Sequence, residues 1–129
     1  MPQTTLQRIL YVEDDPDIQA IARVALESVG GFTVETCNSG QIAVTNAADF
    51  RPEMLLIDVM MPDMDGPTTL AALRDQPSLA DTPAVFITAK VQPDEIEQLQ
   101  NYGAVDIITK PFDPMTLSDQ LRHIWAALP

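Results

Sequence analysis

Residues 9–15 read Ile-Leu-Tyr-Val-Glu-Asp-Asp, a compact apolar run that stops at three consecutive acids. An apolar run without polar residues at alternate positions is typical of a strand buried on both faces, as in a parallel sheet. Behind it, Pro16 suits the first turn of a helix, and apolar residues follow at helical spacing from Ile18 to Val29. The stretch therefore predicts a central strand, an acidic loop and a helix that covers the sheet.

The same alternation of an apolar run and a helical pattern occurs five times along the chain. Further strands are predicted at residues 32–36, 54–57, 84–87 and 105–109. Further helices are predicted from Asn38 or Ser39 to Phe50, from Pro67 through Leu73, from Pro93 to near Gly103, and from Pro114 to Leu128. Strands separated by single helices imply right-handed crossovers. We therefore predict an α/β fold of the doubly wound (βα)5 type, a flavodoxin-like three-layer sandwich with helices on both faces of a parallel sheet.

The composition fits one domain and excludes several classes of function. The chain has 129 residues, 46% of them hydrophobic, and a formal net charge of -12. That charge argues against direct nucleic-acid binding and against binding to an anionic membrane surface. No apolar run is long enough to span a membrane. The single cysteine, Cys37, excludes an internal disulfide and a cysteine-rich zinc site and is compatible with a reducing cytosol, so we expect a cytoplasmic location.

Polar side chains stand where four of the predicted strands end. They are Glu13 and Asp14 after the first strand, Asp58 after the third, Thr88 after the fourth and Lys110 after the fifth. The carboxyl ends of parallel strands share one edge of the sheet, where doubly wound folds place their sites. Clustered carboxylates repel one another, and Mg²⁺ with its preference for oxygen ligands relieves that repulsion. A carboxylate beside Mg²⁺ and a lysine can accept a phosphoryl group.

Each of these residues also has a purely structural interpretation. An acid after a strand is commonly a solvated helix cap, Asp58 could be a turn residue, and Lys110 could be a surface lysine. The joint placement of these residues at the ends of four strands favours a site over these separate interpretations.

Four stretches of the sequence resemble the receiver domain of two-component response regulators, of the chemotaxis type that consists of a single receiver domain. They are residues 9–15, the run Leu-Ile-Asp-Val-Met-Met-Pro-Asp-Met-Asp-Gly at 56–66, Phe-Ile-Thr-Ala-Lys at 86–90, and Gly-Ala-Val-Asp-Ile-Ile-Thr-Lys-Pro-Phe at 103–112. The resemblance covers residues 6–128, which we expect to form the receiver domain, and leaves residues 1–5 as an N-terminal tail. It implies the strand order 2-1-3-4-5.

The resemblance implies a phosphoryl-accepting Mg²⁺ site. Asp58 looks like the phosphoacceptor. Glu13 and Asp14 look like the acidic pair, with Asp14 the more direct Mg²⁺ ligand and Glu13 acting through water, and Met60 would supply a backbone carbonyl to the metal. Asp15 is better explained as a helix cap.

At the ends of the other strands, the resemblance implies residues that bind the phosphoryl group and help the domain to switch between states. Thr88 would bind the phosphoryl group, and Ala89 would leave room beside it. Lys110 would pair with the phosphoryl group, and Lys110-Pro111 is similar to a peptide bond that is usually cis in this family.

The same resemblance implies a signalling partner on each side of the reaction. A sensor histidine kinase or a phosphotransfer protein would supply the phosphoryl group. A protein effector, or an output domain, would read the result at the face formed by the fourth helix, fifth strand and fifth helix, with Lys90 changing its contacts. Ile107 stands where the family often has a rotating Tyr or Phe, so we expect a different readout here. We expect a monomer or a weak dimer.

Two other functions compete with this signalling switch, which would catalyse only its own phosphorylation and dephosphorylation. A phosphohydrolase with an aspartyl-phosphate intermediate usually needs a second acid two residues after the nucleophile, where this chain has Met60. Turnover of added phosphoesters would identify it. A flavodoxin-like electron carrier would need a phosphate loop after the first strand, where three acids would repel FMN. The absence of bound flavin would exclude it.

Overall fold

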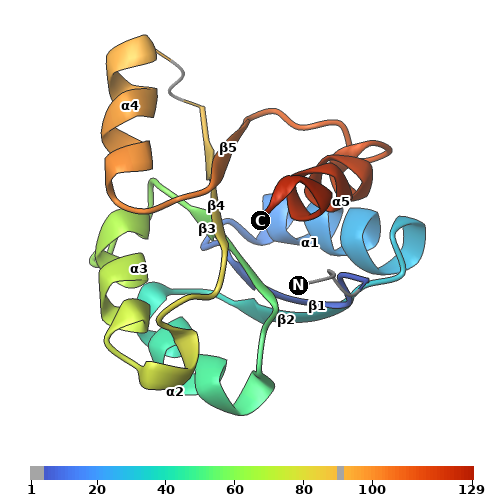
Figure 1. Ribbon diagram of the computed structural model, residues 1–129. Coiled ribbons are helices and arrows are strands. Elements are labelled where there is room, and N and C mark those ends of the chain that lie inside the picture. Colours follow the sequence, from blue (N-terminus) through green and yellow to red (C-terminus); the bar gives the residue numbers. More distant parts are fainter. Residues whose placement is uncertain (1–4, 90–91) are drawn as a thin grey trace.

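A five-stranded parallel sheet forms the centre of the molecule. The computed structural model describes residues 5–89 and 92–129 (Figure 1). The strands are β1 (Arg8–Val12), β2 (Thr33–Cys37), β3 (Met54–Asp58), β4 (Ala84–Thr88) and β5 (Asp106–Thr109). Their order is β2-β1-β3-β4-β5, with every pairing parallel. Both the predicted fold class and the predicted strand order are confirmed.

Helices cover both faces of the sheet. The helices are α1 (Pro16–Arg23), α2 (Gly40–Phe50), α3 (Gly66–Arg74), α4 (Pro93–Asn101) and α5 (Leu117–Ala127), with a π-helix η1 (Val24–Val29) and a 3-10 helix η2 (Pro77–Leu79). Figure 1 shows α1 and α5 on one face and α2, α3 and α4 on the other. No helix within the described residues is long and apolar enough to cross a membrane.

Short polar side chains cap the starts of three helices, two of them as predicted, at Asp15 and Ser39. Asp15 accepts hydrogen bonds from the N–H groups of Asp17 and Ile18 at the start of α1. Ser39 caps α2, and Asp65 caps α3. Each side-chain oxygen satisfies an N–H group that has no partner within its helix. The caps fix where each loop at the carboxyl edge of the sheet turns into a helix.

Two helices differ from the sequence prediction. The last helix begins at Leu117 and not at Pro114, because Asp113 first holds a separate turn: its carboxylate accepts from the N–H of Met115, and its carbonyl accepts from the N–H groups of Thr116 and Leu117. The first helix widens after α1 into η1, where the N–H of Gly30 reaches the carbonyl of Ala25, five residues earlier.

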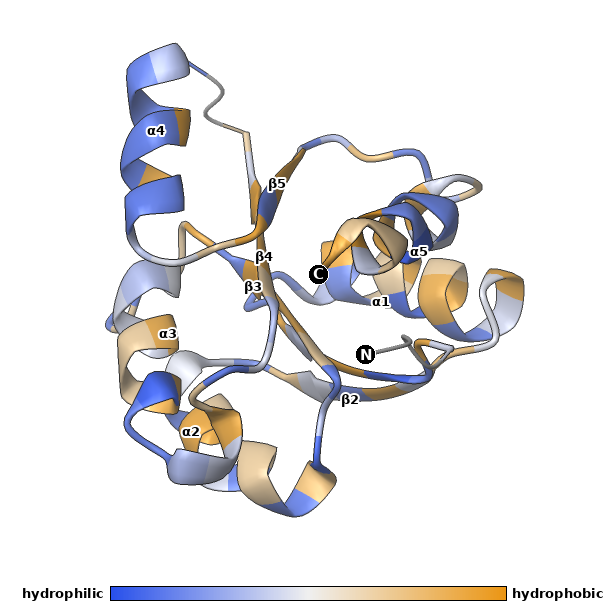
Figure 2. Cartoon of the chain, viewed as in Figure 1, coloured by the Kyte–Doolittle hydropathy of each residue, from blue (hydrophilic) through white to orange (hydrophobic). Residues whose placement is uncertain are grey.

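Apolar side chains form one cluster on each side of the sheet. All five residues of β3 and all five of β4 are buried. On α5, the residues Leu117, Ser118 and Leu121 are buried, and the Ser118 hydroxyl donates to the carbonyl of Ala25 at 2.7 Å. On α4 only Leu99 is buried, and Figure 2 shows this helix as mostly hydrophilic. α5 therefore packs against the rest of the protein with more buried residues than α4 does.

Candidate functional site

Three carboxylates from two neighbouring strands converge at the carboxyl edge of the sheet. Glu13 and Asp14 follow β1, and Asp58 ends β3, which pairs with β1 so that Val12 lies beside Ile57. One carboxylate oxygen from each acid lies within 4.8 Å of the others. Glu13 and Asp58 are buried, whereas Asp14 is exposed. The register of two adjacent strands thus creates the acidic cluster that the sequence predicts.

Lys110 joins this cluster from the end of β5. Its Nζ lies 3.0 Å from Asp58 Oδ1 and 3.1 Å from Glu13 Oε1, so one ammonium group bridges two buried acids. The backbone N–H of Lys110 donates to the carbonyl of Thr88, which holds the end of β5 against β4. The Lys110–Pro111 peptide bond is cis, as the resemblance implies.

Burial and crowding alter the protonation of this group. The pKa of Glu13 is raised to about 7, mainly by burial and next by the hydrogen bond and charge of Asp58, while the hydrogen bond and charge of Lys110 lower it. Burial lowers the pKa of Lys110, but its hydrogen bonds to Asp58 and Glu13 outweigh that effect and the net pKa is raised. Without a cation, Glu13 therefore binds a proton more tightly than an ordinary carboxylate does.

Tyr11 is a neighbour of the site that the sequence analysis treated only as part of an apolar strand. Its ring is fully buried, and its hydroxyl donates to Glu13 Oε1 at 3.2 Å. Burial, and next the negative charge of Glu13, raise the pKa of Tyr11 well above its ordinary value. Residues two apart on a strand point to the same face, and this spacing was the signal that could have paired Tyr11 with Glu13.

The loop that carries the acids is held by hydrogen bonds on both sides. The backbone N–H of Asp15 donates to Glu13 Oε2 at 3.3 Å, while the Asp15 side chain caps α1, as predicted. The Gln19 side-chain amide donates to the Glu13 carbonyl and to Asn38 Oδ1. Gln19 thereby connects the loops after β1 and β2, a connection that the sequence analysis did not identify for Asn38.

Gly66 supports Asp58 from behind. A Cβ at Gly66 would lie 2.7 Å from the Asp58 carbonyl oxygen and 2.8 Å from Val59 Cα. Both are backbone atoms, so neither could move aside cheaply. Glycine at this position therefore lets the start of α3 pack directly against the backbone of the buried acid.

The other predicted site residues lie around this centre at different depths. Thr88 is buried at the end of β4, and Met60 is 57% exposed. Both line a hollow of about 200 Å³ that is also bordered by Glu95 of α4 and by Tyr102, which directly follows α4. Ile107 is half-buried and packs against the apolar cluster on the α2, α3 and α4 side. Lys90 lies outside the described residues.

A second hollow of about 330 Å³ lies beside Lys110. Its lining is mostly apolar and comes from α1 and from the segments after β4 and β5: Ile18, Ile21, Ala89, Lys110, Pro111, Phe112 and Pro114. Ala89 is exposed here, and so is Ile21. The hollow gives the lysine end of the site an apolar surface that a larger molecule could cover.

The donor set of the acidic cluster fits Mg²⁺. The three grouped residues offer carboxylate oxygens, and two of them are already close to an ammonium group that offsets part of their charge. Hard oxygen ligands of this kind suit Mg²⁺, which is usually held by one or two carboxylates together with water and phosphate oxygens. Zinc and copper prefer softer nitrogen and sulfur ligands.

Comparison with known proteins agrees with this geometry. Residues 9–122 match the model of the response regulator receiver domain. The chain is similar to the probable C4-dicarboxylate response regulator DctR of Halalkalibacterium halodurans, with 33% identity over 87% of this chain. It is also similar to the response regulator PleD of Caulobacter vibrioides, with 38% identity over 91% of this chain. In structure it is similar to the chemotaxis response regulator CheY4 of Vibrio cholerae, with a TM-score of 0.85 and 30% identity, covering 93% of this chain and 99% of that chain.

The extent of these matches differs between the relatives. The chain spans 48% of the length of DctR and 26% of the length of PleD. The region that matches the family model contains the acidic cluster, Thr88 and Lys110. The chain belongs to the family of response regulator receiver domains.

Proposed function

We propose that this chain is a phosphorylation switch in which Asp58 accepts a phosphoryl group from a phosphohistidine. The observation that carries the proposal is the position of Asp58, a buried carboxylate 3.0 Å from the Lys110 ammonium and clustered with two further acids. The donor would be a sensor histidine kinase or a phosphotransfer protein, since receiver domains act with histidine kinases.

The residues of the pocket divide the chemistry between them. An oxygen of the Asp58 carboxylate forms a bond to phosphorus while the P–N bond of the phosphohistidine breaks and the imidazole keeps the electron pair. The Lys110 ammonium stabilises charge on the phosphoryl oxygens. The Thr88 hydroxyl would donate to one of these oxygens from the end of β4, and Ala89 would leave room beside it. The reaction therefore needs positioning and charge stabilisation more than a proton donor.

The acids would hold the metal. Asp14 and Asp58 would be direct Mg²⁺ ligands, Glu13 would act through water, and Met60 would contribute its backbone carbonyl. When bound, Mg²⁺ offsets the negative charge of the acids and of the phosphoryl oxygens. The convergence of the three carboxylates supports this assignment.

The donor protein would approach over the hollow beside Lys110. Asp58 itself is only 2% exposed, so the phosphohistidine must reach it from the rim of the site. The hollow adjoins Lys110 and exposes apolar surface at Ile21, which a protein surface could cover. Met115, exposed in the loop before α5, adds apolar surface nearby.

The phosphorylated state would be read by a protein effector, or by an output domain, at the face formed by α4, β5 and α5. Thr88 and Lys110 lie at the ends of the neighbouring strands β4 and β5, and on α4 only Leu99 is buried, so most of this helix is free to contact a partner. Because Ile107 has no ring to change its exposure, the change would be carried by backbone shifts after β4. The coupling available is typically about 1–3 kcal/mol.

Intact-mass measurement with acetyl phosphate and Mg²⁺ tests the phosphoacceptor. The wild-type chain should gain one phosphoryl adduct, and Asp58→Asn should gain none. Asp49→Asn, which changes an exposed aspartate on α2, is the matched control and should be phosphorylated normally. An undiminished adduct on Asp58→Asn would refute the assignment.

NMR spectra with and without beryllofluoride test the readout face. Beryllofluoride mimics the phosphoryl group, so we expect chemical-shift changes to extend from the pocket through residues 89–112. Residues of α2 serve as the internal control and should change little. Changes confined to the immediate surroundings of Asp58 would exclude signalling through α4, β5 and α5.

A further inference from the structure

One hydroxyl group reaches the acidic site from inside the core. The Tyr11 ring belongs to the apolar cluster between the sheet and the α1 and α5 side, and it is fully buried. Its hydroxyl donates to Glu13 Oε1 at 3.2 Å. Side chains in a close-packed core keep one position, so this donor is fixed by the fold and not by the loop that carries the acid.

The same carboxylate oxygen also contacts Lys110. Lys110 Nζ lies 3.1 Å from Glu13 Oε1 and 3.0 Å from Asp58 Oδ1, while Glu13 Oε2 accepts from the Asp15 N–H at 3.3 Å. Under the proposed function, Lys110 turns toward a phosphoryl group on Asp58 and gives up part of its contact with Glu13. Tyr11 would then be the donor that remains on Oε1, because its ring cannot follow the lysine.

We propose that Tyr11 is a positioning residue for Mg²⁺ binding, whose hydroxyl keeps the Glu13 carboxylate oriented toward the cation that Asp14 and Asp58 hold. The inference rests on the proposed function, because it concerns the same metal site. A partner that orients a metal ligand through a hydrogen bond commonly changes metal affinity about 10- to 100-fold when it is lost. Glu13 is expected to act through water, so we expect the lower end of that range.

Tyr11→Phe removes the hydroxyl and leaves the ring in the core. We expect the Kd for Mg²⁺ alone, measured by calorimetric titration and by amide chemical shifts, to rise about tenfold. The Mg²⁺ concentration that gives half the maximal rate of phosphorylation by acetyl phosphate should rise by the same factor, because the variant needs more Mg²⁺ to fill the site. A merely structural role would lower the melting temperature without changing the Mg²⁺ affinity.

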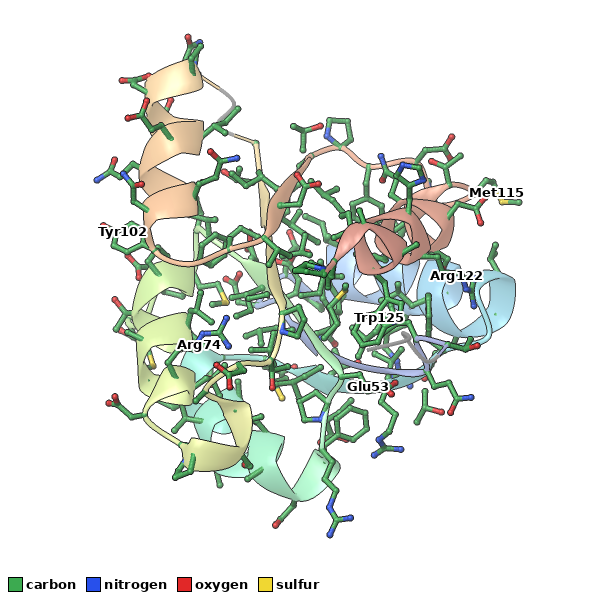
Figure 3. The ribbon with its side chains drawn as sticks, viewed as in Figure 1. Glu53, Arg74, Tyr102, Met115, Arg122 and Trp125 are labelled. Atoms are coloured by element: carbon green, nitrogen blue, oxygen red, sulfur yellow. The ribbon has the colours of Figure 1, made fainter. Side chains whose placement is uncertain are left out.

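Tyr102→Phe is the matched control. Tyr102 is the other tyrosine of the chain, is 50% exposed at the end of α4, and projects at the periphery in Figure 3. Its loss of a hydroxyl should leave the Kd for Mg²⁺ unchanged. Tyr11→Leu, which removes ring and hydroxyl together, should weaken Mg²⁺ binding at least as much as Tyr11→Phe does.

A double-mutant cycle with Glu13→Ala tests whether Tyr11 changes the Kd for Mg²⁺ through Glu13. If Tyr11 acts through Glu13, adding Tyr11→Phe to Glu13→Ala should change the Kd no further. An equal loss in both backgrounds would overturn the inference, and so would an unchanged Kd in Tyr11→Phe while the wild type binds Mg²⁺. A wild-type chain that binds no Mg²⁺ would overturn the proposed function, and this inference with it.

Discussion

The interior of β3 and its carboxyl end are buried to almost the same degree, but burial has opposite effects in the two places. Met54 to Ile57 place apolar side chains in the two clusters that flank the sheet, which stabilises the fold by about 25 cal/mol for each Å² removed from water. Asp58 places a carboxylate beside Glu13, and Lys110 bridges both acids. The comparison shows that one strand supplies stability along its length and gives some of it up at its end, where function requires charge.

Substitution in the interior should have the largest effect on stability. Leu56 is fully buried, so Leu56→Ala removes buried apolar surface and leaves a cavity. We expect the free energy of unfolding, measured with urea, to fall by about 2–5 kcal/mol. The increase in melting temperature on adding Mg²⁺ should persist, because the Leu56 side chain has no oxygen with which to bind the cation. A loss below about 1 kcal/mol would contradict the assignment of this strand as the core of the fold.

At the carboxyl edge of the sheet, Glu13 should make the stability of the protein depend on pH in a way that an ordinary acid would not. The pKa of Glu13 is about 7 in the folded protein and 4.5 in its ordinary state. The folded metal-free protein therefore holds a proton that the unfolded chain has lost, and its stability falls as pH rises from about 4.5 to about 7. Above about pH 7 the folded protein carries the whole penalty of an ionised Glu13, which lowers the free energy of unfolding by on the order of 3 kcal/mol.

Glu13→Gln should flatten this pH dependence. The variant should match wild type near pH 4 and be more stable near pH 8, as measured by thermal melts in the absence of Mg²⁺. Glu97→Gln, on the exposed part of α4, is the control and should keep the wild-type slope. If Glu13→Gln and wild type have parallel pH profiles, the acidic cluster does not strain the folded state.

Gly66→Ala should affect both regions at once. The new Cβ would meet the Asp58 carbonyl oxygen at 2.7 Å, so α3 or the end of β3 must shift. Overpacking of this kind costs about 1–3 kcal/mol. We also expect slower phosphorylation by acetyl phosphate, because the shift moves Asp58 relative to Lys110. Gly31→Ala lies in open space at a positive φ and should destabilise without changing the phosphorylation rate.

Removal of the exposed acid should have the smallest effect. Asp14→Ala relieves repulsion in the metal-free site, so the metal-free protein should become more stable, by no more than about 1 kcal/mol because water screens an exposed group. The increase in melting temperature caused by millimolar Mg²⁺ should shrink in the same variant, since mass action on the folded state is weaker. A variant that responds fully to Mg²⁺ would remove Asp14 from the metal site.

The sequence was sufficient to predict the sheet and to predict that the polar residues at the carboxyl ends of its strands lie close together. Apolar runs mark the strands, and in a parallel sheet their carboxyl ends must meet, which brought Glu13, Asp58 and Lys110 together before any distance was known. It was not sufficient for features that depend on tertiary contacts. The turn at Asp113 delays α5, and the hydroxyl of Tyr11 becomes a donor only because the strand places it beside Glu13.

The position of β1 between β2 and β3 has a consequence for the order of events during folding. β1 pairs with both β2 and β3, so these three strands are contiguous and can form a partial sheet before β4 and β5 join it. That partial sheet would already bring Glu13, Asp14 and Asp58 together, while Lys110 arrives with the last strand. The early intermediate would thus carry the full repulsion of the acids without its ammonium partner. We expect stopped-flow refolding at pH 8 to be accelerated by Mg²⁺ in the wild type and much less in Asp14→Ala.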